Sequence, residues 1–392
     1  MASALADLRA AGTAVYLPSL LYGTAQGATV PLVALTARDL DAPVATAAVV
    51  VGLVGIGKIL GDVPAGWLAG RFGERRAMLV ATGVFVLGSI ACLVAWALPV
   101  LMAGAAAIGA ATAVFAVARQ LYVTEQMPYE VRGRAMSTLG GMQRVGLFAG
   151  PALGAAVMSV LGTAGGYWLA VAMALVAALV LSLTPDPDGP PTRAAKAPPH
   201  RTLALVREHF PVLRTVGFGI LLLGAVRASR QAAIPLWGDH IGLDPATTSL
   251  IFSLSGAMEL VFFYPAGMVM DRFGRGWVVV PSTLVLALSV ALLPLSGGVT
   301  GLAVFAGLIG LGNGLGSGIN MTLGADASPA EGRAAFLGVW RLFGDLGNGA
   351  GPLLVGAVAT VATLGAGIVA AGVAGGVSAV ILARSLSRRR PA

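Results

Sequence analysis

PAGWLAGRFGERR, at residues 64–76, returns 201 residues later as PAGMVMDRFGRGW, at residues 265–277. Both copies follow a long apolar stretch and end in a cluster of charged side chains. At the same offset Glu125 aligns with Asp326, and each of these acids stands three residues before a proline. The chain therefore contains two halves of similar length that repeat the same order of segments.

The composition around these motifs is that of a membrane protein. Hydrophobic residues make up 57% of the 392 residues and charged residues only 11%, whereas soluble domains contain about 45–50% apolar and about 25% charged residues. Intrinsic disorder is excluded because disordered chains are poor in apolar residues. A membrane β-barrel is disfavoured because the apolar stretches are continuous and do not alternate with a period of two.

The apolar stretches predict an all-α membrane protein with 12 transmembrane helices in two pseudo-symmetric bundles of six. A helix needs about 20 apolar residues to cross a bilayer. The polar, proline-containing stretch 185–211 is predicted to link an N-terminal bundle (1–184) to a C-terminal bundle (212–392) with a basic tail. The predicted spans cover residues 11–36, 44–69, 77–98, 100–122, 135–161, 163–184, 212–237, 246–270, 277–298, 300–325, 334–360 and 361–383.

The basic residues predict the orientation of these spans. Of the 25 lysines and arginines, six lie well inside predicted spans, Arg38 lies in a loop on one side, and the other 18, including Arg214 at the start of its span, lie on the opposite side. Basic residues gather on the cytoplasmic side of membrane proteins. We therefore expect a multi-pass protein of the cell membrane with both termini and the linker in the cytoplasm. The net charge of +8 reflects this orientation and does not indicate nucleic-acid binding.

The repeated motif resembles the signature of the major facilitator superfamily, which reads G-x-x-x-D-R-x-G-R-R between spans 2 and 3. The resemblance covers essentially the whole chain, although Gly70 stands in place of the aspartate in the first half. The fold that this resemblance implies is the one that the apolar stretches predict, and the activity it implies is secondary transport by alternating access. The matching residues are Gly66, Arg71, Gly73 and Arg75 in the first half and Gly267, Asp271, Arg272, Gly274 and Arg275 in the second.

The resemblance also implies an inner gate built from the charged motif residues. Acids at the cytoplasmic ends of spans 4 and 10 contact the signature arginines in this family, which gives gating roles to Glu125 and Asp326. Their expected partners are Arg71, Arg132, Arg272 and Arg333.

A second pattern in span 5 resembles the antiporter motif of the 12-span drug–proton antiporters in the same superfamily. It consists of Gly146, Gly150, Pro151 and Gly154, and span 11 carries a looser version at residues 347–356. Small residues four apart also allow two helices to pack closely in lipid. The pattern is therefore compatible either with antiport or with a tight helix crossing alone.

Ionisable side chains within the predicted spans are candidates for the site. Each is costly in hydrocarbon, so each is expected to face a cavity or to pair with another. Lys58 with Asp62, and Arg341 with Asp345, share a helix face at i,i+4 spacing and could be structural ion pairs. The full set comprises Lys58, Asp62, Arg119, Arg144, Arg227, Arg230, Glu259, Arg341 and Asp345.

Three roles are assigned to these and nearby residues. Glu259, Asp62 and Asp345 are the candidates for proton coupling, because a buried carboxylate can take up a proton. Arg119, near the end of span 4, is expected mainly to support the gate. The candidates for substrate binding are Arg227, Arg230, Lys58, Arg144, Arg341, Gln26 and Trp340. Arg227 and Arg230 share one face of span 7 with no acid on that helix, and the excess of cations favours an anionic or zwitterionic substrate.

These patterns predict a proton-coupled secondary transporter, namely an efflux antiporter of amphipathic small molecules. The alternatives are an importer or exchanger of organic anions and a flippase for lipid or lipid-linked substrates. No enzyme activity, cofactor or metal is expected, because no nucleophile–base pair or metal-ligand set stands in the spans. The glycine run GLGNGLG (310–316) imitates a nucleotide-binding loop but lies inside an apolar span with no preceding strand. We expect the chain to act as a monomer in the bilayer.

Overall fold

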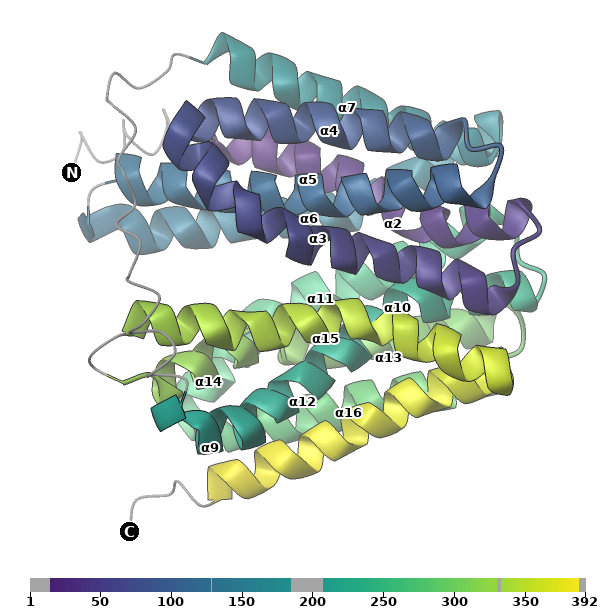
Figure 1. The fold of residues 1–392 in the computed structure, drawn as a ribbon. Helices are drawn as coiled ribbons and strands as arrows, with labels where there is room; N and C mark the ends of the chain where they lie inside the picture. The colour runs from purple at the N-terminus through teal and green to yellow at the C-terminus, as the bar shows by residue number, and fades with distance from the viewer. Residues whose placement is uncertain (1–14, 128, 185–206, 330–332, 388–392) are drawn as a thin grey trace. The chain divides into compact units, whose positions relative to one another are not determined.

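The computed structural model describes residues 15–127, 129–184, 207–329 and 333–387, and all regular elements in these ranges are helices (Figure 1). The helices of the first half of the chain are α2 (Leu17–Asp39), α3 (Val44–Phe72), α4 (Glu74–Leu93), α5 (Leu98–Gln126), α6 (Tyr129–Leu161) and α7 (Thr163–Leu183). Most of the predicted linker (185–206), residues 388–392 of the tail and Pro128 lie outside the described residues.

The second half of the chain repeats this order with two irregularities. It begins with a short helix, α9 (Phe210–Val212), and a π-helical turn, η2 (Leu213–Gly217), which run directly into α10 (Phe218–His240). The other elements are α11 (Pro245–Phe273), α12 (Gly276–Leu292), the 3₁₀ turn η3 (Leu293–Leu295), α13 (Gly298–Leu315), α14 (Ile319–Ala327), α15 (Arg333–Val361) and α16 (Leu364–Ser387).

Within the described residues, ten segments are long and apolar enough to cross a membrane, judged by length and composition. The helices α2 and α15 are not among them, although both are long enough. Polar residues such as Gln26 in α2 and Arg341, Asp345 and Asn348 in α15 lower their apolar character. The count of 12 spans therefore stays a prediction.

One predicted span is broken in the structure. Residues 300–325 were expected to form a continuous helix, but α13 ends at Leu315 and α14 begins at Ile319. Gly316, Ser317 and Gly318 form a turn between them. Glycine and serine favour helices less than the apolar residues around them, and the high mean hydropathy of the window hides this local signal. The break lies inside a candidate span, Gly298–Gly324.

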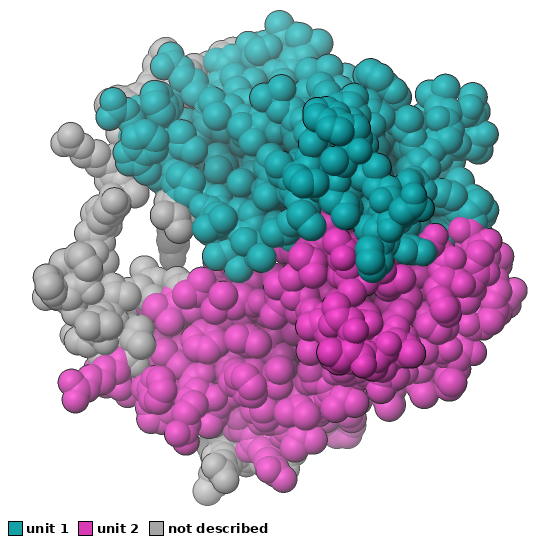
Figure 2. Space-filling view, turned by 45° about the vertical axis from the view of Figure 1, so that its right-hand side comes forward, with its two compact units in different colours: residues 1–43, 53–194, 244–253 teal, residues 44–52, 195–243, 254–392 magenta. Residues whose placement is uncertain are grey.

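The chain divides into two compact units, which Figure 2 colours separately. The first unit contains residues 1–43, 53–194 and 244–253, and the second contains 44–52, 195–243 and 254–392. The units therefore follow the two predicted halves except at the first residues of α3 and α11, which each belong to the unit of the other half. Neither exchange was expected from the sequence, because the apolar pattern runs through both helices without a change.

Glycines allow close helix packing in the same way in each unit. In the first unit α2 packs against α6, and a Cβ atom at Gly146 of α6 would collide with the backbone oxygen of Leu20. In the second unit α10 packs against α15, and a Cβ atom at Gly347 would collide with the backbone oxygen of Leu221. The glycine pattern of spans 5 and 11 thus forms tight helix crossings, as small residues do in membrane proteins.

Candidate functional site

A polar cluster joins three helices of the second unit. Glu259 on α11 forms an ion pair with Arg230 on α10, with 2.8 Å between Oε2 and Nη2, and the two side chains are only 19% and 18% exposed. Asn313 on α13 donates its Nδ2 hydrogen to the same Oε2 atom at 2.7 Å. Arg230 also donates through Nη1 to the Ser255 hydroxyl at 3.4 Å. One carboxylate oxygen therefore receives two donors from two other helices.

The local sequence explains how the cluster forms. Ser255 and Glu259 are four residues apart on α11 and so lie on one face of that helix. Asn313 is a single amide within the glycine run of α13, and a Cβ atom at the next residue, Gly314, would be 2.6 Å from the backbone oxygen of Glu259. The glycines therefore bring the backbones of α11 and α13 close enough for an asparagine side chain to reach the carboxylate. Glu259 was predicted from the sequence, whereas Asn313 and Ser255 were missed.

Arg227 has a different partner from Arg230. Its Nη2 atom donates to the backbone oxygen of Gly316, the residue at which α13 breaks. The last carbonyls of a helix lack partners within it, and basic side chains stabilise them. The sequence grouped both arginines of α10 as candidates for substrate binding, and in the structure Arg230 contacts a carboxylate whereas Arg227 contacts a backbone oxygen.

A second polar network lies in the first unit. Arg119 on α5, which is only 8% exposed, donates through Nη2 to the Oε1 atom of Gln143 on α6. Gln143 in turn donates to Gln26 on α2 at 3.5 Å. Beside them the ring of Tyr22 stacks on Phe115 with 3.9 Å between centroids. Arg119 was expected to support the gate, but the structure places it with Gln26, one of the predicted substrate-binding residues.

The predicted residues on α15 take structural positions. Arg341 and Asp345 form the expected i,i+4 ion pair, with 3.6 Å between Nε and Oδ2, and the arginine is 48% exposed. Trp340 is only 2% exposed, and its indole nitrogen donates at 2.9 Å to the backbone and side-chain oxygens of Asn320 on α14. Trp340 thus joins α14 to α15, and its role in substrate binding stays a prediction.

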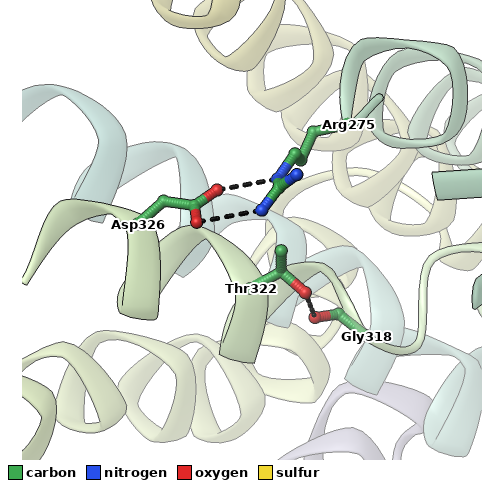
Figure 3. Close-up of polar contacts among 4 residues, drawn as sticks. All are labelled: Arg275, Gly318, Thr322 and Asp326. Carbon is green, nitrogen blue, oxygen red and sulfur yellow. Dashed lines mark hydrogen bonds and ion pairs between the residues drawn. The ribbon is translucent and has the colours of Figure 1, made fainter. Parts of the chain in front are cut away.

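The charged motif of the second half is held by a bidentate ion pair, shown in Figure 3. Nε and Nη2 of Arg275 lie 2.8 and 3.1 Å from the two carboxylate oxygens of Asp326 on α14. The sequence paired Asp326 with Arg272 and Arg333, so its described partner is a correction. The guanidinium of Arg272 instead lies over the ring of Phe273, with 5.3 Å between Cζ and the ring centroid.

The first half holds its motif arginine by a different contact. Arg75 donates at 2.7 Å to the backbone oxygen of Leu181 and at 2.5 Å to that of Ser182, the last carbonyls of α7. Arg71 lies over the ring of Trp67, with 5.7 Å between Cζ and the centroid. The side chains of Glu125, Asp271, Arg132 and Arg333 lie outside the described part of the structure.

The motif glycines divide into two kinds. Gly73 and Gly274 follow α3 and α11 with φ angles of +85° and +90°, which residues other than glycine rarely adopt. Gly66 and Gly267 have no atom within 4 Å of a Cβ built on them. The remaining predicted residues, Lys58 and Asp62 on α3 and Arg144 on α6, are partly buried. Among the described residues, no group of three or more histidine, cysteine, aspartate or glutamate side chains could hold a metal ion.

Comparisons with known proteins agree on the family. The family model of the Major Facilitator Superfamily matches residues 15–228 and 216–392. A probable metabolite transport protein of Bacillus subtilis, CsbC, is 24% identical over 364 residues, which are 83% of this chain and 73% of that protein. The arabinose-proton symporter of the same organism is 31% identical over 131 residues, which are 33% of this chain and only 28% of that protein.

Solved structures share the fold of the chain. A POT family transporter in complex with 5-aminolevulinic acid matches with a TM-score of 0.73 and 14% identity, and the match covers 96% of both chains. A D-xylose-proton symporter matches with a TM-score of 0.68 and 17% identity over 93% of this chain and 94% of the other. At this level of identity the likeness concerns the fold alone.

Proposed function

The chain belongs to the Major Facilitator Superfamily, and from this premise we propose that it is a proton-coupled transporter that works by alternating access. As a transporter of this family it is not an enzyme. The observation that carries the proposal is the buried ion pair of Glu259 and Arg230. In our proposal the twelve long helices of the chain all span the membrane, as two bundles of six.

Glu259 is the proposed proton carrier. While the carboxylate is charged, Arg230 and Asn313 both bind its Oε2 atom and hold α10 and α13 to α11. A proton on Glu259 removes the negative charge that attracts the guanidinium, so the three helices lose their strongest common contact. Because protonation changes the relative free energies of two arrangements, it can shift their populations. Asp62 and Asp345 are the other candidates, although Asp345 already has a partner on its own helix.

We propose that the transporter is an antiporter that exports amphipathic small molecules. In antiport, the substrate and the proton compete for one group, so a positively charged or hydrogen-bond-donating part of the substrate would bind Glu259 when the proton leaves. The glycine–proline pattern of α6, which resembles the antiporter motif, supports this direction. The Gln26, Gln143 and Arg119 network offers further polar contacts for a substrate.

Proton symport of an anionic substrate is the second candidate. Protonation of Glu259 would free the Arg230 guanidinium, which can bind a carboxylate or phosphate through two parallel hydrogen bonds. The proton and the anion would then bind together and move in the same direction. Two proteins whose sequence or structure is similar to this chain are named as proton symporters. Two of the cations that first favoured an anion have partners within the protein, since Arg227 donates to a backbone oxygen and Arg341 pairs with Asp345.

Transport by the purified protein in liposomes tests the proposal. Proton gradients of both signs should be imposed, and cationic, zwitterionic and anionic compounds should be offered. An antiporter accumulates a compound on the more acidic side, whereas a symporter accumulates it on the more alkaline side. Glu259→Gln should abolish accumulation driven by the gradient and leave exchange of the compound intact, while Asp62→Asn and Asp345→Asn show whether either of the other candidates carries the proton. Accumulation by Glu259→Gln at the wild-type level would refute the role of Glu259.

The proposed location is the cell membrane, with both termini and the linker in the cytoplasm. Cysteines introduced at Lys196 and His240, in a Cys92→Ala background, should differ in their access to a reagent that cannot cross the membrane. Only the cysteine at position 240 should react from outside the cell. Labelling of position 196 alone would show that the orientation is the opposite of the one proposed.

A further inference from the structure

We propose that Asn313 is a positioning residue that changes its hydrogen bond according to the protonation state of Glu259. The proposal rests on the function proposed above, in which Glu259 carries the proton. Asn313 is only 7% exposed, and its side chain is held between α13 and α11 by the bond to Glu259 Oε2. Its role in transport would be indirect, through the orientation of one amide.

The first step concerns the amide oxygen of Asn313. Nδ2 donates to the carboxylate, but Oδ1 is buried and has no hydrogen-bond partner among the described residues. A buried acceptor without a donor is unfavourable. A charged carboxylate only accepts hydrogen bonds, so it cannot satisfy this oxygen. While Glu259 is charged, the amide nitrogen of Asn313 is therefore hydrogen-bonded and the amide oxygen is not.

The second step is what a proton on Glu259 changes. The neutral carboxyl group carries an O–H donor, and an asparagine amide presents its oxygen in place of its nitrogen after a half-turn about the Cβ–Cγ bond. Asn313 Oδ1 can then accept the Glu259 hydrogen, so the acceptor that is unsatisfied in the charged state is used in the neutral state. The proton that enters from water resides on the carboxyl group, and no covalent bond of Asn313 forms or breaks.

The surroundings of Glu259 make this change consequential. The charged groups that face it within the described residues are Arg230 and Arg227 of α10, while α13 provides a neutral amide. Asn313 stands three residues before Gly316, where α13 breaks and Arg227 donates to the backbone oxygen, which also accepts a hydrogen bond from the N–H of Ile319. Arg230 and Arg227 lie one turn apart on α10. The contact with Glu259, which protonation weakens, and the contact with Gly316 at the break in α13 are therefore made from the same turn of α10. The Asn313 amide thus rotates within the last turn of α13, next to the break between α13 and α14.

The pH dependence of transport by Asn313 variants tests the inference. Asn313→Asp keeps the size of the side chain but removes both N–H donors, and Asn313→Leu removes all polar atoms. Each loses a charge-assisted bond to the carboxylate, which is stronger than the bond that the neutral acid would make. The pH of half-maximal proton-driven transport should therefore rise by about one unit, which is a tenfold change in proton affinity. Asn313→Gln, which restores an amide, should move the midpoint back toward the wild type.

Two controls separate this inference from the function on which it rests. Thr283→Val removes a buried hydroxyl of α12 that bonds only within its own helix, to Val279 at 2.7 Å, and should leave the midpoint unchanged. In a Glu259→Gln background, where only exchange of the compound remains, Asn313→Leu should leave the pH dependence of that exchange unchanged. If Glu259→Gln remains proton-driven, the proposed function is wrong. If it does not, and the folded Asn313 variants keep the wild-type midpoint, the inference about Asn313 is wrong.

If Asn313→Leu does not fold, Asn313→Ala replaces it, because the added carboxylate of Asn313→Asp raises the midpoint by charge repulsion alone. Infrared absorption gives an independent readout. The carbonyl stretch of protonated Glu259, identified by its loss in Glu259→Gln, should shift in frequency when its hydrogen-bond acceptor is removed in Asn313→Leu. An unshifted band would contradict an O–H bond to the amide oxygen.

Discussion

Each unit contains a polar cluster that includes an arginine, and the hydrogen-bond partners of the two arginines differ. In the first unit Arg119 donates to the amide of Gln143, which donates in turn to Gln26. In the second unit Arg230 pairs with the carboxylate of Glu259, which also accepts a hydrogen bond from Asn313. The partner that receives the guanidinium is thus a neutral amide in one half of the repeat and an acid in the other.

This difference separates two tasks that a coupled transporter must perform. A glutamine side chain does not gain or lose a proton near neutral pH, so its contact with an arginine is the same on both sides of a proton gradient. A carboxylate can titrate, and its contact with an arginine is then sensitive to the gradient. The two arginines do not correspond in the repeat, since Arg119 aligns with Asn320 and Arg230 with Thr29 at the offset of 201 residues, so the two clusters are separate solutions. The predictions below test whether the two clusters differ as their partners imply.

Removal of the arginine should have the largest and most unequal effect. Arg230→Ala leaves the Glu259 carboxylate buried without its ion-pair partner, which costs about 3–5 kcal/mol of stability. Arg119→Ala leaves neutral amide groups behind and should cost about 1–3 kcal/mol. Thermal unfolding in detergent measures both. The double variant Arg230→Ala/Glu259→Gln should recover most of the loss, and equal losses for the two single variants would remove the distinction between the clusters.

The glycine crossings should behave alike in the two units. Gly146→Ala in α6 and Gly347→Ala in α15 each place a methyl group against a backbone oxygen of the neighbouring helix. Overpacking of this kind costs about 1–3 kcal/mol. Gly66→Ala is the matched control, since nothing lies within 4 Å of its added Cβ atom. Melting temperatures should fall for the first two variants and not for the third.

The starts of α3 and α11 differ by one cap. Asp244 accepts a hydrogen bond from the backbone N–H of Thr247 at 2.9 Å, whereas Pro43 at the aligned position of the first half has no such side-chain bond. The hydrogen bonds from the side chain and backbone of Thr247 hold the pKa of Asp244 below its ordinary value of 3.8. The charged Asp244 therefore stabilises the folded protein fully above the pKa that this carboxyl has in the unfolded chain. The stabilisation is lost as the pH falls through the lower pKa that Asp244 has in the folded protein.

Asp244→Ala should lower stability by about 1 kcal/mol at neutral pH, as the loss of an N-cap does. Asp244→Asn keeps the cap and should remove the loss of stability below pH 4, which unfolding in a pH series would detect. Pro43→Ala is the control in the first half and should show no such dependence on pH. A pH dependence that persists in Asp244→Asn would place its cause elsewhere.

The motif contacts should show the smallest difference. Arg275 and Asp326 are 44% and 37% exposed, and an exposed ion pair contributes about 0–1 kcal/mol. Asp326→Asn should therefore destabilise the protein slightly at low salt, and the loss should vanish near 1 M salt because charges are screened. Arg75→Ala, which removes bonds to backbone carbonyls of α7, should respond less to salt. An Asp326→Asn effect that is independent of salt would contradict an ion-pair origin.

Several features of this protein followed from the sequence alone. The helical, membrane-embedded class follows from composition, because lipid admits only segments that satisfy their own backbone hydrogen bonds and carry few charges. The turn glycines Gly73 and Gly274 were recognisable from the repeat, since a positive φ is a property of the local backbone. The i,i+4 pair of Arg341 and Asp345 was recognisable for the same reason, because its spacing is set within one helix.

Other features were decided by the tertiary structure. The sequence could place Glu259, Arg227 and Arg230 within apolar spans, but the choice between a carboxylate, a backbone carbonyl and a ligand as partner depends on which helix faces meet. The same holds for Asp326, whose partner is Arg275 and not Arg272. In the sequence, the break at residues 316–318 is visible only as part of a glycine run. The structure shows that Arg227 donates to the backbone oxygen of Gly316 at this break. The preference of a residue for water or lipid depends on that residue alone, so it can be read from composition. A side-chain contact depends on two residues, so it is decided only when the helices pack.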